Sequence, residues 1–249
     1  MPVRTHVADR IGEIIFDHPP VNALGSAAWN EVPDIVTAMG RDPDVRCVLI
    51  RAEGRGFCGG VDIKEMQAHP ERIVALNRGN YRTFQAVRAC EVPVVSGVHG
   101  FIIGSGIGIC GASDVVIAAE DAFFSLPEVD RGAMGGASHL MRMFPLQKVR
   151  AAFFTGGRID AAEAYRLGAV EKVVPRESLV EEARAFCAVI AGKSRKALVT
   201  AKEALNGIEP RDVDHGYRFE QGFTLEMYLH EDSQRARDAF VDTGKAAAF

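Results

Sequence analysis

The first 120 or so residues alternate short β-rich runs with helical stretches, and this alternation constrains the fold more than any other feature of the chain. Apolar runs such as "DVRCVLIRAE", "VPVVSGVHG" and "SDVVIAAE" are typical of buried strands, and residues 27–39 and 62–87 show helical patterns. Strands separated by helical crossovers pair in parallel. After "VEKVVP" at Val170, three consecutive segments are predicted as helices, the last over residues 213–241. The sequence therefore predicts an α/β protein whose last third is helical.

Composition excludes several functional classes. The 249 residues suffice for one large domain with a sizeable core. A net charge of −4 gives no basic field for nucleic acid or an anionic membrane. The five cysteines show no CxxC spacing, and they lie mostly in apolar runs that predict buried free thiols. Because no signal peptide and no apolar run of about 18 residues is visible, we expect a cytoplasmic protein without a membrane span.

Two glycine-rich stretches are the candidates for ligand binding. In "GRGFCGGVDIKEM", glycines let the backbone turn with positive φ and approach a ligand with exposed N–H groups, and Asp62 is placed to cap the helix that follows. In "HGFIIGSGIGICGASD", small residues from Gly104 to Gly108 open a buried helix, whose start presents unpaired N–H groups. Two such loops facing one another could give one N–H each to a developing oxyanion, and each donor is worth about 3 kcal/mol in acyl chemistry. Taken singly, each stretch is equally compatible with a tight turn or with close helix packing.

These two stretches, together with "FFSLPEVDRGAMGG", resemble the crotonase (enoyl-CoA hydratase/isomerase) superfamily. The likeness extends over nearly the whole chain, through "PPVNAL", "DPDVRCVLIRAEGRGF" and "FFTGGRIDAAEAYRLGAVEKVVP". It implies a ClpP-like spiral of ββα units over residues 1–190 and a helical trimerisation region over residues 191–249. It further implies an acyl-CoA ligand, with coenzyme A as part of the substrate and no permanently bound cofactor or metal. The assembly expected from the resemblance is a homotrimer or a hexamer built as a dimer of trimers.

The resemblance also assigns roles to particular residues. The backbone N–H groups of Gly59 and Ser105 match the two oxyanion-hole positions of the family, and Glu128 matches a catalytic glutamate. The coenzyme A site is expected along two short segments, which contain Ala23, Leu24, Gly60, Val61, Asp62 and Ile63.

The chain departs from a hydratase of this family at Gly108. Hydratases place a second glutamate there, and adding water across a double bond needs one group to activate the water and another to protonate carbon. The missing side chain is expected to leave room for a bulky fused ring. His139, in "GGASHLMR", is a candidate for catalysis or for lining the pocket, and Asp130 is a weaker catalytic candidate.

Finer details resemble one branch of the family, the mycobacterial hydrolases that open the last steroid ring, as a bicyclic CoA thioester, during cholesterol degradation. The shared features include "GIG" at the start of the helix, "LPEV.RGA", "AKEALN" and "YR.EQGFT". The resemblance implies hydrolysis of a carbon–carbon bond, with Glu128 as base or proton shuttle.

Other functions stay open at this stage. A Δ3,Δ2-enoyl-CoA isomerase needs only one glutamate, and an ordinary hydratase of fatty-acid metabolism is a further alternative. The stretch "GIGICG" formally satisfies GxGxxG, but "FIIGS" separates it from the preceding strand, whereas a dinucleotide fingerprint follows its strand directly. An RNA-binding or scaffold role lacks support, because neither a basic patch nor an aromatic-rich strand is visible.

Overall fold

A six-stranded sheet forms the centre of the computed structural model, which describes residues 2–247. Its strand order is β1-β2-β4-β6-β8-β11, and every neighbouring pair is parallel except β1 and β2. The parallel pairing predicted from the alternation is therefore confirmed. The six strands are β1 (Val3–Ala8), β2 (Ile11–Phe16), β4 (Cys47–Ala52), β6 (Val94–Val98), β8 (Val115–Ala119) and β11 (Lys172–Val174).

Short second strands turn this plan into a spiral of ββα units. A strand of the main sheet is followed by a short strand outside it and then by a helical segment, and this order occurs four times along the described residues. The short strands pair among themselves in two small sheets. They are β3 (Ala23–Leu24), β5 (Gly60–Val61), β7 (Phe101–Ile103), β9 (Phe123–Ser125) and β10 (Arg158–Asp160). The crotonase-type fold class is thus confirmed.

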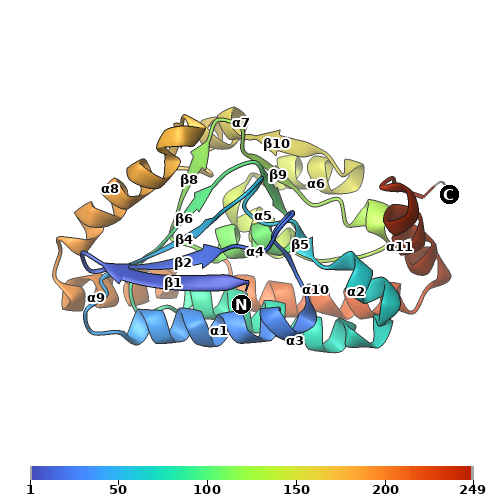
Figure 1. The fold of residues 1–249 in the computed structure, drawn as a ribbon, viewed down its shortest axis with the longest axis horizontal. Helices are drawn as coiled ribbons and strands as arrows, with labels where there is room; N and C mark the ends of the chain where they lie inside the picture. The colour runs from blue at the N-terminus through green and yellow to red at the C-terminus, as the bar shows by residue number, and fades with distance from the viewer. Residues whose placement is uncertain (1, 248–249) are drawn as a thin grey trace.

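Helices cover both faces of the main sheet (Figure 1). On one side α1 (Ser26–Arg41) packs against α3 (Ile73–Arg88), and the larger hydrophobic core lies between these helices and the sheet. On the other side α8 (Leu179–Ala191) closes a smaller core. All five cysteines are buried free thiols, as predicted from their apolar surroundings.

The helix predicted over residues 62–87 is interrupted. The structure divides it into α2 (Ile63–Ala68), a 3-10 turn (Pro70–Arg72) and α3, because Pro70 has no N–H to continue the ladder. Asp62 caps α2 as predicted, since its Oδ1 accepts the backbone N–H of Lys64 at 3.0 Å. The break turns α2 away from α3 at the edge of the cleft described below.

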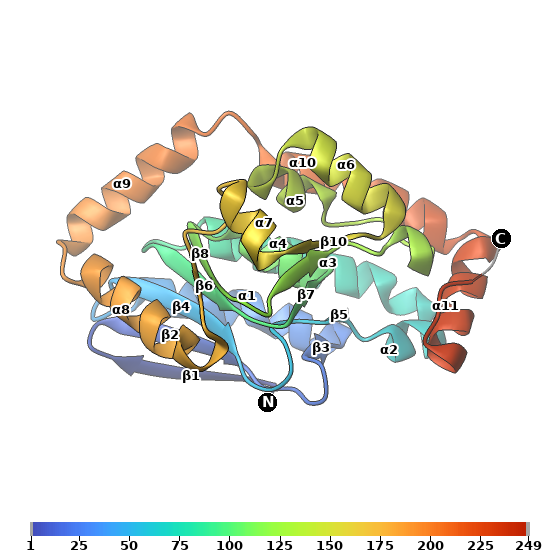
Figure 2. The ribbon, with the colours of Figure 1, turned by 90° about the horizontal axis from the view of Figure 1, so that it is seen from above.

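The last part of the chain returns to the core. After α9 (Arg195–Ile208), α10 (Val213–Tyr228) packs against α3 and α5 (Ala137–Met143), and α11 (Glu231–Thr243) packs against α2 (Figure 2). The segment predicted as one helical stretch over residues 213–241 is therefore two helices, separated at Leu229 and His230. A division at residue 190 stays a prediction. Among the residues that the structure describes, no helix is long and apolar enough to cross a membrane.

Candidate active site

A cleft of about 520 Å³ joins the glycine-rich stretches to the helices that follow them, and this volume lies within the range of small-molecule sites. One wall comes from β3, β5 and α2, and the floor comes from α3 and the start of α4 (Ser105–Ala112). The far wall comes from the segment after β9 and from α10 and α11. Segments far apart in sequence therefore converge on one site.

The start of α4 supplies one free backbone donor. Gly104 has φ 54°, a conformation that favours glycine, and Ser105 is the first residue of the helix. The first helical bonds run from Ile107 and Gly108 to the carbonyl of Gly104, so the Ser105 N–H has no partner within the helix. Ser105 lines the cleft, as the prediction requires of an oxyanion donor.

The first glycine loop lies opposite Ser105, but the predicted donor is already engaged. The Gly59 N–H donates to the carbonyl of Val21 at 2.9 Å. A methyl group built on Gly60 would lie 3.7 Å from the Ser105 nitrogen, whereas one built on Gly59 would meet Val21. The Gly60 N–H contacts only the Cys58 sulfur, at 3.3 Å, which is a weak acceptor. Gly59, Gly60 and Val61 all line the cleft, but the Gly59 N–H is engaged by Val21, so the candidate donors of this loop are Gly60 and the residue after it.

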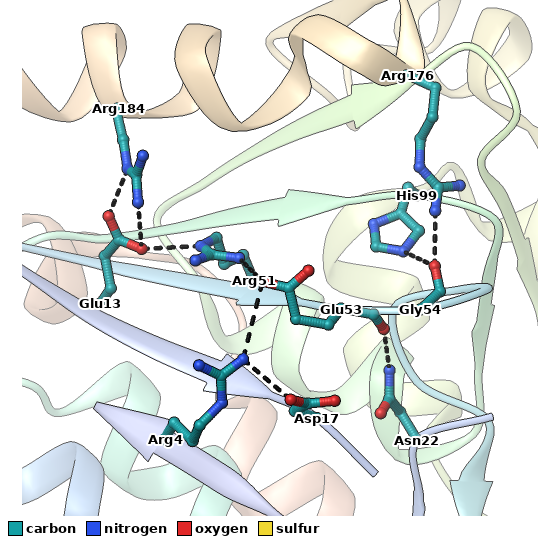
Figure 3. Close-up of polar contacts among 10 residues, drawn as sticks. All are labelled: Arg4, Glu13, Asp17, Asn22, Arg51, Glu53, Gly54, His99, Arg176 and Arg184. Atoms are coloured by element: carbon teal, nitrogen blue, oxygen red, sulfur yellow. Dashed lines mark hydrogen bonds and ion pairs between the residues drawn. The ribbon is translucent and has the colours of Figure 1, made fainter. Parts of the chain in front are cut away.

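A polar network on the loop's outer side holds it in place (Figure 3). The Gly54 carbonyl accepts from Arg176 Nη2 at 2.8 Å and lies 3.3 Å from His99 Nε2. The amide of Asn22 donates to the carbonyls of Glu53 and Gly56 at 2.8 and 2.9 Å. Burial, helped by Arg176, lowers the pKa of His99 to about 4, so this imidazole is neutral. The network positions the loop and leaves its cleft side open.

Glu128 is the carboxyl group of the cleft. Its Oε1 would lie 3.3 Å from a methyl built on Gly104, which places it beside the helix start. Its Oε2 is buried and has no hydrogen-bond partner among the described residues. Burial raises the pKa of Glu128 to about 8; the nearby Glu220 also raises this pKa and Arg131 lowers it. A carboxyl group of this kind can exchange a proton with a substrate near neutral pH.

The space expected at Gly108 is filled by Phe84. A methyl group on Gly108 would lie 2.1 Å from Cζ of Phe84, so the ring occupies the position where a larger side chain would extend. The expectation that Gly108 leaves room for a fused ring is therefore wrong. Phe84 lines the cleft, and an apolar ring stands where a hydratase would have its second carboxylate.

His139 and Asp130 lie away from the cleft surface. His139 is fully buried and packs against the rings of Phe84 and Tyr217, with centroids 4.8 and 5.0 Å away. Those two rings line the cleft and His139 does not, and burial lowers its pKa to about 3. Asp130 Oδ2 faces Gly156, where a methyl would lie 2.4 Å away. The geometry supports a packing role for His139 and no contact between Asp130 and a ligand.

The segments expected to bind coenzyme A form one side of the cleft. Leu24 is fully buried beneath this wall, whereas Lys64 and His18 lie on it and bring positive charge or polarity to the site. The other predicted residues all line the cleft, namely Ala23, Gly60, Val61, Asp62 and Ile63.

Sequence reasoning missed a set of polar groups in the cleft. Asn77 and Asn80 lie three residues apart on α3 and share a helix face with Phe84. Asn77 Nδ2, Asn80 Oδ1 and Arg237 Nε are buried and have no partner in the described part of the chain. Two asparagines at helical spacing on an apolar face were a signal that could have been noticed. Among the described residues, no cluster of three or more His, Cys, Asp or Glu could hold a metal ion.

Comparisons with known proteins find relatives over almost the whole chain. The enoyl-CoA hydratase/isomerase family profile matches residues 7–248. The chain is 49% identical over 239 residues to (7aS)-7a-methyl-1,5-dioxo-2,3,5,6,7,7a-hexahydro-1H-indene-carboxyl-CoA hydrolase of Rhodococcus jostii, covering 95% of this chain and 93% of that protein. It is also 49% identical over 231 residues to the Mycobacterium tuberculosis protein of the same name, covering 92% and 93%. The crystal structure of an enoyl-CoA hydratase from Mycobacterium avium subsp. paratuberculosis superposes with a TM-score of 0.87 at 25% identity, covering 100% and 98%.

Proposed function

Since the chain belongs to the enoyl-CoA hydratase/isomerase family, we propose that it is an acyl-CoA enzyme that hydrolyses a carbon–carbon bond in a bicyclic, steroid-derived CoA thioester. The name of the Rhodococcus relative describes a methylated indene skeleton with two oxo groups and a CoA thioester. At 49% identity over almost the whole chain, the same substrate class is the first candidate for this protein.

Unpartnered polar atoms of residues that line the cleft carry the proposal. Buried polar groups are normally hydrogen-bonded, so Asn77 Nδ2, Asn80 Oδ1 and Arg237 Nε need partners from a ligand. A fused ring with two ketone oxygens offers acceptors to the nitrogens of this set. A straight enoyl chain is apolar beyond its thioester and would leave Asn77 Nδ2 and Arg237 Nε unpaired, which costs about 1–3 kcal/mol for each.

The reaction uses the groups that face each other across the cleft. Water adds to a ring ketone, the adjacent carbon–carbon bond breaks, and the electron pair is delocalised as an enolate, or its vinylogue, that reaches the thioester. The N–H of Ser105 and an N–H from the Gly60–Val61 turn stabilise the thioester oxygen. Glu128 acts from its ionised form, which is the minor fraction near neutral pH because its pKa is about 8; it takes the proton from water and returns it to carbon. Coenzyme A enters as part of the substrate, and the steps require no resident cofactor.

An enoyl-CoA isomerase is the second candidate. Phe84 occupies the region beside Gly108, so the described cleft has no second carboxylate at that position. A single glutamate can move a proton between two carbons but is poorly suited to hydration. This observation favours an isomerase over a hydratase, whereas the polar atoms of the cleft favour the bicyclic substrate over both.

The proposal includes a homotrimer or a hexamer in the cytoplasm. Leu229 is 91% exposed, Ile208 76% and Phe219 69%, and all three lie in the region of α9 to α11. Large apolar side chains at this exposure are typical of surfaces that pack against another subunit. Free buried thiols suit a reducing compartment.

Mass spectrometry in heavy-oxygen water tests the reaction. A bicyclic diketone CoA thioester should yield a ring-opened acid with the label in a new carboxylate, and crotonyl-CoA should be hydrated slowly. Rapid labelling of crotonyl-CoA as an alcohol, without ring opening of the bicyclic thioester, would instead establish a hydratase. Double-bond migration without label in either product would establish the isomerase.

A further inference from the structure

Arg237 is a buried cation without an anionic partner. Arg237 is only 3% exposed, and it lines the cleft from α11. Its guanidinium donates to the Ser233 hydroxyl and, at 2.7 Å, to Gln234 Oε1, and it lies 4.3 Å from the centroid of the Tyr228 ring. All these partners are neutral, and Nε has none among the described residues.

Arg131 shares this situation on the facing segment. Its guanidinium carbon lies 3.4 Å from the centroid of the Phe240 ring, and the residue lines the same cleft. Within the described chain it forms no ion pair at 4.0 Å or less. Glu128 interacts with it electrostatically, but that carboxyl group keeps its proton up to about pH 8. The Asp130 carboxylate, next to Arg131 in the chain, also interacts with it electrostatically, but not at ion-pair distance, so Arg131 has no close anionic partner among the described residues.

The turn that carries Arg131 and the helix α11 that carries Arg237 are joined by hydrogen bonds. The Ser233 hydroxyl accepts from Arg237 Nη1 and donates to the carbonyl of Gly132, the residue after Arg131. A methyl on Gly132 would lie 2.4 Å from Ser233 Cα, so α11 and this turn touch. Burying a cation without a counter-charge is expensive, and buried charges are as a rule paired. Both arginines line the cleft, so a counter-charge is expected from the ligand.

We propose that Arg131 and Arg237 form an anion subsite in the acyl part of the cleft, which holds the attacked ketone oxygen and then the carboxylate that ring opening creates. The inference rests on the proposed function for the identity of that anion. In the reaction, the water oxygen bonds to the ketone carbon, and the bond from this carbon to the neighbouring ring carbon breaks. The electron pair leaves with that ring carbon, which is protonated. The new acid loses its proton to solvent, and the charge on the original ketone oxygen grows from partial to that of a carboxylate. Guanidinium groups suit this change, because they donate in a fork that matches a carboxylate.

Binding of two unreactive thioesters tests the subsite without requiring turnover. Adipoyl-CoA carries a carboxylate at the far end of its acyl chain, and hexanoyl-CoA is its uncharged counterpart of equal length. By isothermal titration calorimetry, the protein should bind adipoyl-CoA about tenfold to a hundredfold more tightly than hexanoyl-CoA. Arg237→Gln and Arg131→Gln should each remove most of this preference and leave hexanoyl-CoA binding within about threefold. Arg235→Gln, at an exposed arginine of the same helix that pairs with Asp232, should keep the preference.

Two outcomes overturn the inference and one separates it from the proposed function. Equal binding of the two thioesters by the unaltered protein refutes the subsite, even when ring opening is observed. An unchanged preference in Arg131→Gln refutes it as well, and this half-buried position remains available when Arg237→Gln fails to fold. A carboxylate preference that both variants abolish, in a protein that does not open the bicyclic ring, supports the subsite and rejects the proposed reaction.

Discussion

Replacing Glu128 by glutamine should stabilise the protein increasingly as the pH rises. Burial raises the pKa of Glu128 to about 8 from an ordinary value of 4.5. In the folded protein this carboxyl group keeps its proton up to about pH 8, whereas in the unfolded chain it loses it near pH 4.5. The folded state therefore binds more protons in this window, and the free energy of unfolding falls as the pH rises through it. Glutamine keeps the size and the hydrogen-bonding groups but cannot ionise.

The expected size of the effect follows from the shift. Between about pH 5.5 and pH 8, the full slope of about 1.4 kcal/mol per pH unit would give about 3.5 kcal/mol, and the partial ionisation of Glu128 close to pH 8 reduces this to about 3 kcal/mol. Urea denaturation of both proteins at the two pH values, at one fixed protein concentration, measures the change in their difference. Other titrating groups are common to both proteins and cancel in this comparison. Turnover should fall by about 10²–10⁴ in the variant while acyl-CoA binding persists. A stability difference that does not change with pH would show that Glu128 titrates normally and that its burial does not control its chemistry.

The remaining predictions concern the other walls of the cleft. Ser105→Gly should retain most activity. Ser105→Pro should lower kcat about 10²–10³-fold because it deletes the backbone N–H donor at a first helical position, which tolerates proline. Equal losses of kcat in both variants would implicate the Ser105 hydroxyl instead. Gly108→Glu should destabilise the protein by 1–3 kcal/mol or more, measured by urea denaturation, because its side chain collides with Phe84. In a Phe84→Ala background, which is itself destabilised, adding Gly108→Glu should cost less stability than it does alone because the collision is removed, and it should gain crotonyl-CoA hydration. A stable single variant would contradict the steric argument. His139→Leu should change stability by less than about 1 kcal/mol and leave kcat unchanged, because both ring nitrogens are already unpartnered; a large loss of kcat with native binding would restore a catalytic role.

The sequence was informative wherever a local rule determined the structure. Alternating strands and helices predicted the parallel sheet, and Asp62 before an amphipathic run predicted the cap of α2. The motif around Glu128 predicted a carboxyl group that the fold then places beside the start of α4. In each case the deciding residues are close together in the chain.

The structure adds contacts that the sequence did not reveal where distant segments meet. No local pattern shows that Val21 occupies the Gly59 N–H, that the Phe84 ring fills the space at Gly108, or that His139 lies behind Phe84 and Tyr217. Arg237 was missed because its sequence surroundings are those of a charged surface helix. Only the packing of α11 against α2 brings it to the cleft. Such contacts depend on tertiary packing, which periodicity and composition do not specify.

The position of α11 at the cleft also affects when the site comes into being during synthesis. Arg237, Phe240 and Val241 follow every other cleft-lining residue in chain order, and α11 packs on α2, which leaves the ribosome about 160 residues earlier. Chains begin to fold from their N-terminal part while they are still being made. The glycine loops and Glu128 can therefore be in place on a nascent chain whose far wall does not yet exist. Until α11 docks, the buried carboxyl group faces water, and the catalytic groups acquire their final environment only in the last step of folding.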